Sequence, residues 1–176
     1  ALDWLRGGDA ACFRDTMETI REHYPRPAFY SALNILGTHD TPRILTLLGA
    51  EHVPDTKDAR AAYRLSPEER QKGEARLRVG EMLLYCFPGS PTVYYGDEAG
   101  MEGFEDPYPW DRQDRALLDF FRSLGQLRRH RPSLQDGDLT YVYAQGGALV
   151  LRRQLGDEIT VAALNTGETA VEVSLP

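Results

Sequence analysis

Residues 34–43, which read Asn-Ile-Leu-Gly-Thr-His-Asp-Thr-Pro-Arg, place an imidazole and a carboxylate side by side at His39 and Asp40. A largely apolar run precedes the pair, so both side chains follow the point where a buried strand would end. In barrels of alternating strands and helices, catalytic groups lie at the C-terminal ends of the strands. The pair therefore stands where chemistry would be done. The alternative is that Asp40 or Thr41 caps a short helix whose first residue is Pro42.

A second segment, residues 88–101, contains a turn, then a short aromatic and β-branched strand at Thr92–Tyr95, then a Gly-Asp-Glu sequence. Two motifs carry the comparison with known barrels: His39-Asp40-x-x-Arg43 and Gly89-x-Pro91-x-x-Tyr94-Tyr95-Gly96-x-Glu98. In their residue types and order they resemble the last two strands of the α-amylase superfamily barrel. The resemblance is in particular to its neopullulanase, cyclomaltodextrinase and maltogenic-amylase branch.

This resemblance implies an α/β fold made of the last two β/α units of a (β/α)8 TIM barrel, followed by an antiparallel β-sandwich C-terminal domain. Ser31–Thr38 and Thr92–Tyr95 would be the seventh and eighth strands. Two parallel strands do not form a stable sheet alone, so we expect the chain to be the C-terminal part of a longer protein. After Pro132 the pattern changes to a period of two. We therefore expect residues 1–131 to belong to the barrel and residues 132–176 to an incomplete sandwich.

Local signals predict the elements around these strands. Asp9 and Asp114 are placed to cap helices, and residues 66–69 form a capping box with proline at the first helical position. Cys12 and Cys86 fall in predicted helices and are interpreted as buried thiols. In the C-terminal part, strands are expected at residues 141–144, 148–154, 158–165 and 171–175.

Retaining hydrolysis of an α-glucan requires a nucleophilic carboxylate and a general acid about 5 Å apart. A third carboxylate can bind sugar hydroxyls more strongly in the transition state than in the ground state. Carried over by motif, the resemblance assigns Asp40 as this catalytic stabiliser and His39 as a substrate-binding donor to the same sugar ring. It assigns Asp106 to a sugar contact farther away. Asp106-Pro107 runs directly into Tyr108-Pro109-Trp110, and whether the Arg-bearing insert expected between them is truly absent stays open. Nothing matches the nucleophile or acid motifs, so the chain alone should be inactive.

Several neighbouring side chains are expected to support this site. Arg43 should hold its loop by pairing with a nearby acid, and Glu98 should anchor its loop by hydrogen bonds. Tyr94 and Tyr95 alternate along their strand, so one should face the barrel interior and the other the outer helices. Trp110 could stack on a glucose ring or pack between loop and helix.

Composition excludes several classes of function. The chain has 176 residues, with 41% hydrophobic and 27% charged, which are globular values. A net charge of −7 argues against nucleic acid and anionic membranes as partners. The basic run Arg128-Arg129-His130-Arg131 ends a predicted helix and is interpreted as a solvated helix end. No apolar run suits a membrane span, and the histidines and cysteines lack ligand spacing, so neither a metal nor a cofactor is expected. The expected location is the cytoplasm.

The leading hypothesis is a retaining α-glucan hydrolase that cleaves α-1,4 bonds, with α-1,6 bonds as a further option. Its partners would be starch-derived oligosaccharides, pullulan or cyclodextrins. The alternatives are a non-catalytic carbohydrate-binding or assembly module and a transglycosylase of the same superfamily. A transporter-subunit role is disfavoured by the lack of a membrane segment. Linkage preference and oligomeric state stay open, with a homo-oligomer among the options.

Overall fold

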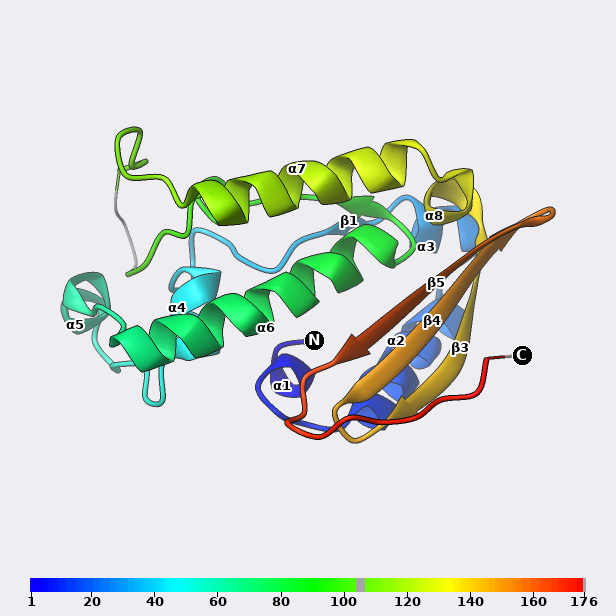
Figure 1. Ribbon diagram of the computed structural model, residues 1–176, viewed down its shortest axis with the longest axis horizontal. Helices are drawn as coiled ribbons and strands as arrows, with labels where there is room; N and C mark the ends of the chain where they lie inside the picture. Colours follow the sequence, from blue (N-terminus) through cyan, green and yellow to red (C-terminus); the bar gives the residue numbers. More distant parts are fainter. Residues whose placement is uncertain (104–106, 176) are drawn as a thin grey trace. The chain divides into compact units, whose positions relative to one another are not determined.

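The computed structural model describes residues 1–103 and 107–175, and the chain divides into two compact units. Figure 1 shows the elements in chain order. The first unit comprises Ala1–Asn34, Val79–Pro91 and Leu124–Pro176, and the second comprises Ile35–Arg78 and Thr92–Ser123. The long helices α6 (Pro67–Cys86) and α7 (Arg115–Arg129) each contribute residues to both units.

An antiparallel sheet dominates the first unit, with the strand order β3-β4-β5. The strands are β3 (Asp138–Gln145), β4 (Ala148–Leu155) and β5 (Glu158–Asn165), which confirms three of the four strands predicted after Pro132. The fourth, at residues 171–175, is wrong, because this segment adopts no strand. Its apolar residues instead line a hollow together with side chains of β4 and β5.

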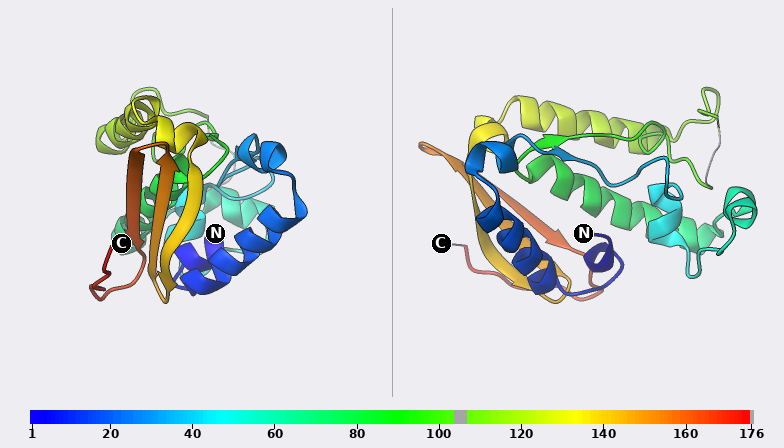
Figure 2. Two further views of the ribbon diagram at one scale, coloured as in Figure 1. Left: turned by 90° about the vertical axis from the view of Figure 1, so that its right-hand side faces the viewer. Right: turned by 180° about the vertical axis from the view of Figure 1, so that it is seen from behind.

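Helices cover part of this sheet. Helix α2 (Ala10–His23) packs along β3, as Figures 1 and 2 show, and α8 (Pro132–Asp136) contacts β4 and β5. The short helices α1 (Leu2–Leu5) and α3 (Arg26–Tyr30) both contact α2. The predicted cap of α2 is confirmed, since the Asp9 carboxylate accepts the N–H of Ala11 at 2.8 Å.

An aromatic cluster forms the core of the first unit. The ring of Phe13 stacks on Trp4 with 5.7 Å between centroids, and Phe87 meets both Phe13 and Phe29 edge-on at about 6 Å. All four side chains are buried. Beside them, buried Arg153 donates to the carbonyl oxygens of two helix-end residues, Gly137 and Cys86.

A parallel strand pair is present as predicted, but the first strand is shorter than expected and the second lies earlier in the chain. The strand predicted at Thr92–Tyr95 is wrong, because that segment adopts no strand. Only β1 (Leu33–Asn34) and β2 (Ser90–Pro91) form a ladder, with Leu33 opposite Ser90. Parallel strands are normally longer when a neighbouring strand pairs with each of their two edges. Among the described residues, β1 pairs only with β2 and β2 only with β1. Leu33 is consequently 74% exposed, which is unusual for an apolar strand residue.

Two further predictions for the first unit are correct only in part. Cys12 is exposed, because it lies on the outer side of α2, whereas Cys86 is buried as expected and burial raises its pKa to about 11. Of the basic run, Arg129, His130 and Arg131 are exposed as predicted, but Arg128 is not solvated in this way. Its guanidinium donates to the carbonyl oxygens of Tyr85, Phe87 and Gly89, where α6 ends.

The second unit contains α4 (Ile44–Gly49), α5 (Lys57–Ala62) and the beginnings of α6 and α7. Helices α4 and α6 approach closely through glycines: a Cβ on Gly73 would lie 3.0 Å from the Cα of Gly49 and 2.9 Å from the carbonyl oxygen of Leu45. The buried apolar side chains of this unit include Ile44, Leu45, Leu48, Leu77 and Leu117.

Candidate functional site

His39 and Asp40 lie in a tight loop that precedes α4. The N–H of Thr41 donates to the carbonyl oxygen of Thr38, and the Thr38 N–H donates to the Thr41 hydroxyl, both at 3.3 Å. This turn leaves the His39 and Asp40 side chains each 80% exposed, with 3.4 Å between His39 Nε2 and Asp40 Oδ1. The helix-cap alternative is wrong, because the N-cap of α4 is Arg43 and no side chain caps it. An imidazole and a carboxylate are therefore presented together to solvent.

Arg43 anchors the base of this loop and is only 2% exposed. Its backbone N–H donates to the carbonyl oxygen of Gly103 at 2.9 Å, and its Nη1 donates to the carbonyl oxygen of Tyr95. The guanidinium also lies over the Tyr95 ring, 4.3 Å from the ring centroid. The structural role predicted for Arg43 is confirmed, although its described bonds are to carbonyl oxygens rather than to an acid.

The segment after β2 forms a compact turn against this anchor. Glu98 accepts the N–H of Gly96 and the hydroxyl of Tyr108, both at 2.9 Å, which confirms its predicted anchoring role. The prediction that Tyr94 and Tyr95 face opposite sides is wrong. Their rings contact each other at 4.9 Å, because the chain leaves the extended conformation at this point and both rings approach Arg43.

A buried acid, Asp97, lies beneath the loop that carries His39 and Asp40. It is 3% exposed, and a Cβ on Gly37 would lie 3.2 Å from its Oδ2. Burial raises the pKa of the Asp97 carboxyl to about 7; the charge of Arg43 opposes this rise, and the charge of Glu98 adds to it. A carboxyl group in this environment is neutral in a large fraction of molecules at neutral pH.

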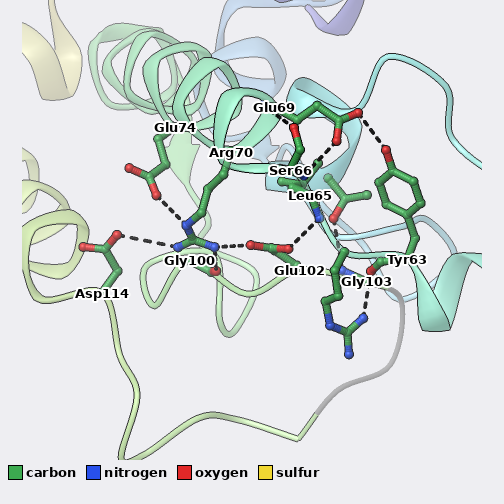
Figure 3. A network of polar contacts seen from close by, with 12 residues as sticks. Tyr63, Leu65, Ser66, Glu69, Arg70, Glu74, Gly100, Glu102, Gly103 and Asp114 are labelled. Atoms are coloured by element: carbon green, nitrogen blue, oxygen red, sulfur yellow. Dashed lines mark hydrogen bonds and ion pairs between the residues drawn. The ribbon is translucent and has the colours of Figure 1, made fainter.

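A network of charged side chains holds the segment from Gly100 to Glu102 to α6, as Figure 3 shows. The Arg70 guanidinium binds Glu74 at 2.9 Å and also Glu102, lies 3.7 Å from Asp114, and donates to the carbonyl oxygen of Gly100 at 3.3 Å. Asp114 in turn caps α7 by accepting the N–H of Leu117, as predicted. One arginine thus ties the loop to two helices.

The capping box of α6 borders this network (Figure 3). The N–H of Glu69 donates to Ser66 Oγ at 3.2 Å, and the N–H of Ser66 donates to Glu69 Oε2 at 2.9 Å, which confirms the predicted box. Backbone hydrogen bonds from Ser66 and Glu51, joined by the Tyr63 hydroxyl, lower the pKa of Glu69 to about 2. The same bond to Glu69 raises the pKa of Tyr63 to about 12.

Asp106, the third residue assigned by sequence, lies outside the described residues. Trp110 follows it and is 78% exposed, with its ring tilted against Tyr108 at 4.5 Å, so of its two alternatives the one that packs it between loop and helix is wrong. Within the described part of the chain, no three His, Cys, Asp or Glu side chains are grouped to hold a metal ion. No helix there is long and apolar enough to cross a membrane.

Residues 9–135 match the profile of the α-amylase catalytic domain. The chain belongs to the α-amylase family. An amylopullulanase of Thermoanaerobacterium saccharolyticum is 38% identical over 152 residues, which cover 84% of this chain and 11% of that protein. A cyclomaltodextrinase of Geobacillus thermopakistaniensis is 29% identical over 208 aligned residues, covering all of this chain and 32% of the relative.

Solved structures give the same family. The type III pullulan hydrolase from Thermococcus kodakarensis superimposes with a TM-score of 0.80 at 27% identity, over 99% of this chain and 30% of that one. The chain thus spans between about a tenth and a third of the length of these relatives. Its structural neighbours are α-amylase-family enzymes, and the two motifs that carried the resemblance lie inside the matched region.

Two parts of the site were not found from the sequence. Asp97 is one of two adjacent acids in a turn, and nothing in its type distinguishes it from Glu98, which binds polar groups at the surface of the turn. The partners of Arg70 at Glu102 and Asp114 are distant in the chain. No local signal in the sequence identifies either feature, because both depend on residues distant in the chain.

Proposed function

We propose that this chain forms the seventh and eighth β/α units of an α-amylase-family barrel, followed by the first strands of a C-terminal β-sandwich. The parallel pairing of β1 with β2 supports the barrel assignment. The antiparallel sheet that begins at Asp138 supports the sandwich assignment. A boundary near Pro132, between residues 1–131 and 132–176, is compatible with the end of the catalytic-domain match at residue 135.

We infer that the longer protein is a retaining α-glucan hydrolase. Its substrates would be starch-derived oligosaccharides, pullulan or cyclodextrins, cleaved at α-1,4 and, as a further option, α-1,6 bonds. The names of the relatives, amylopullulanase and cyclomaltodextrinase, support this class of substrate. The nucleophile and the general acid would come from parts of that protein other than these 176 residues.

In this proposal Asp40 is the carboxylate that stabilises the transition state. The observation that carries it is the exposure of Asp40 and His39 side by side on a loop whose base is fixed by buried Arg43. An exposed carboxylate accepts hydrogen bonds from sugar hydroxyls, and an imidazole N–H donates one. Ring distortion toward an oxocarbenium ion strengthens such bonds. Asp106 would contact a sugar farther from the cleaved bond.

The test replaces Asp40 in the full-length enzyme that contains this chain. Asp40→Asn should lower kcat by roughly 10²–10³-fold with a small change in KM, because a contact made mainly in the transition state is lost. The matched control is Asp119→Asn, a 70% exposed acid on α7, which should leave kcat unchanged. Activity is measured on pullulan and β-cyclodextrin, and chromatography of the products separates hydrolysis from transglycosylation.

The alternatives give different outcomes. If the full-length protein binds maltooligosaccharides but turns over none of them, the non-catalytic carbohydrate-binding or assembly role is correct. If Asp40→Asn retains the kcat of the Asp119→Asn control, the proposal of a hydrolase is still valid, but Asp40 is not its third catalytic carboxylate.

A further inference from the structure

Asp97 is a buried acid to which the proposed function gives no task. Its backbone is fixed within a turn, because its N–H donates to the carbonyl oxygen of Tyr94 at 3.1 Å and its own carbonyl oxygen accepts the N–H of Gly100 at 3.2 Å. Its side chain is 3% exposed, so it does not reach substrate directly. Any effect of Asp97 on chemistry must therefore pass through a neighbour.

The neighbour is Gly37, which is itself buried. A Cβ at this glycine would lie 3.2 Å from Asp97 Oδ2 and 3.6 Å from Oδ1. The glycine is needed here for close approach rather than for an unusual backbone angle, because it is not among the residues with positive φ. The loop that carries His39 and Asp40 thus begins close to the Asp97 carboxyl, with too little room for a side chain at position 37.

Two charged groups face this carboxyl. Arg43, on the loop side, attracts it, and the adjacent Glu98 repels it. Glu98 is held away by Gly96 and Tyr108, and the Arg43 guanidinium is directed to the carbonyl oxygen of Tyr95. Among the described residues, Asp97 Oδ1 is buried without a hydrogen-bond partner, and so is Arg43 Nε.

We propose that Asp97 is a positioning residue for the catalytic loop, and that it holds Asp40 in place through van der Waals contact with Gly37 and through the charge of Arg43. This inference depends on the proposed role of Asp40. The carboxyl fills the space beneath Gly37, so removing it lets the loop sink, and adding a methyl group to Gly37 pushes the loop outward. Either shift moves Asp40 relative to a sugar bound above it.

The test is a double-mutant cycle in the full-length enzyme, with Gly37→Ala, Asp97→Ala and the double variant. Each single substitution should lower kcat on the order of 10–100-fold, as displacement of a reacting group by about 1 Å does, while KM changes less. The double variant should recover part of this loss, because the smaller side chain at position 97 makes room for the new methyl group. Independent effects would instead multiply. Asp97→Asn keeps the size and shape of the side chain, so it should lower kcat less than Asp97→Ala does.

Gly125→Ala is the control for glycine replacement, because a Cβ at Gly125 meets nothing within 4 Å. The inference is overturned if the double variant shows the product of the single losses, or if Gly37→Ala behaves like Gly125→Ala. Should Gly37→Ala not fold, the comparison of Asp97→Ala with Asp97→Asn decides, and an unchanged kcat for Asp97→Ala refutes it. Asp40→Asn is measured alongside: a large loss there without coupling at Asp97 rejects the positioning role only, whereas no loss rejects the function of Asp40.

Discussion

Replacing Arg70 by glutamine should loosen the loop around Glu102 without unfolding the helices. Arg70 is 33% exposed, and its guanidinium is shared by Glu74, Glu102 and Asp114. Fully exposed ion pairs contribute about 0–1 kcal/mol, whereas breaking a buried pair costs about 3–5 kcal/mol. An arginine one-third exposed lies between these limits, so we expect a local loss of about 2 kcal/mol. The glutamine also leaves three carboxylates together without a cation.

This loss of local stability is best measured at the backbone amide of Leu65, because its N–H donates to Glu102 Oε2 at 3.0 Å. Native-state hydrogen exchange reports local opening, and about 2 kcal/mol corresponds to an exchange rate roughly 30-fold faster. Arg70→Lys keeps the charge but lacks the planar guanidinium. Its Leu65 exchange rate should therefore lie between those of Arg70→Gln and the wild type. The control is Arg122→Gln, which removes an exposed pair with Asp119. It should change stability by less than about 0.5 kcal/mol. If Leu65 exchanges equally fast in Arg70→Gln and Arg122→Gln, the network does not hold the loop.

Two further predictions concern charge and exposed surface. The pKa of Asp97 is about 7 in the folded chain and 3.8 when unperturbed, so the stability from its neutral form is complete below pH 4 and is lost as pH rises through 7. At 1.36 kcal/mol per pH unit the loss is up to about 4 kcal/mol, and Asp97→Asn should flatten this slope in urea unfolding measured from pH 4 to pH 8. The isolated chain should self-associate through exposed apolar residues in and next to β1, Leu33 at 74% and Ile35 at 40% exposure. Light scattering and dye binding to apolar surface test this, and a compact monomer that binds no dye would contradict it.

The features that could be predicted from the sequence are those whose partners are near in the chain. Asp9 and Asp114 cap their helices through N–H groups two and three residues away, and the Ser66–Glu69 box also closes within one turn. Such geometry follows from residue type and spacing alone. The position of His39 and Asp40 together on one loop was predictable for the same reason, since the residues are adjacent.

Features decided by distant partners were missed or misjudged. Arg128 was interpreted as solvated, but it binds carbonyl oxygens some 40 residues earlier, at the end of α6. The burial of Asp97 depends on the approach of Gly37, which no local pattern encodes. An arginine or an acid has the same identity whether it lies in water or in a packed turn, so its role is fixed only when the chain is folded.

For the two barrel strands, the length predicted from the local sequence pattern differs from the length that pairing with other strands allows. Pattern gave the correct direction, because β1 and β2 are parallel and separated by helices. It predicted strands of eight and four residues at 31–38 and 92–95, whereas the observed strands have two residues each, at 33–34 and 90–91. Strand length depends on hydrogen bonds to neighbours on both edges, and a central parallel strand is normally covered on both faces. Leu33 and Ile35 have the apolar character of such a strand without the cover. If strands of the longer protein pair with these edges, residues 31–38 should extend, and the loop that carries Asp40 should then begin at the end of a complete strand.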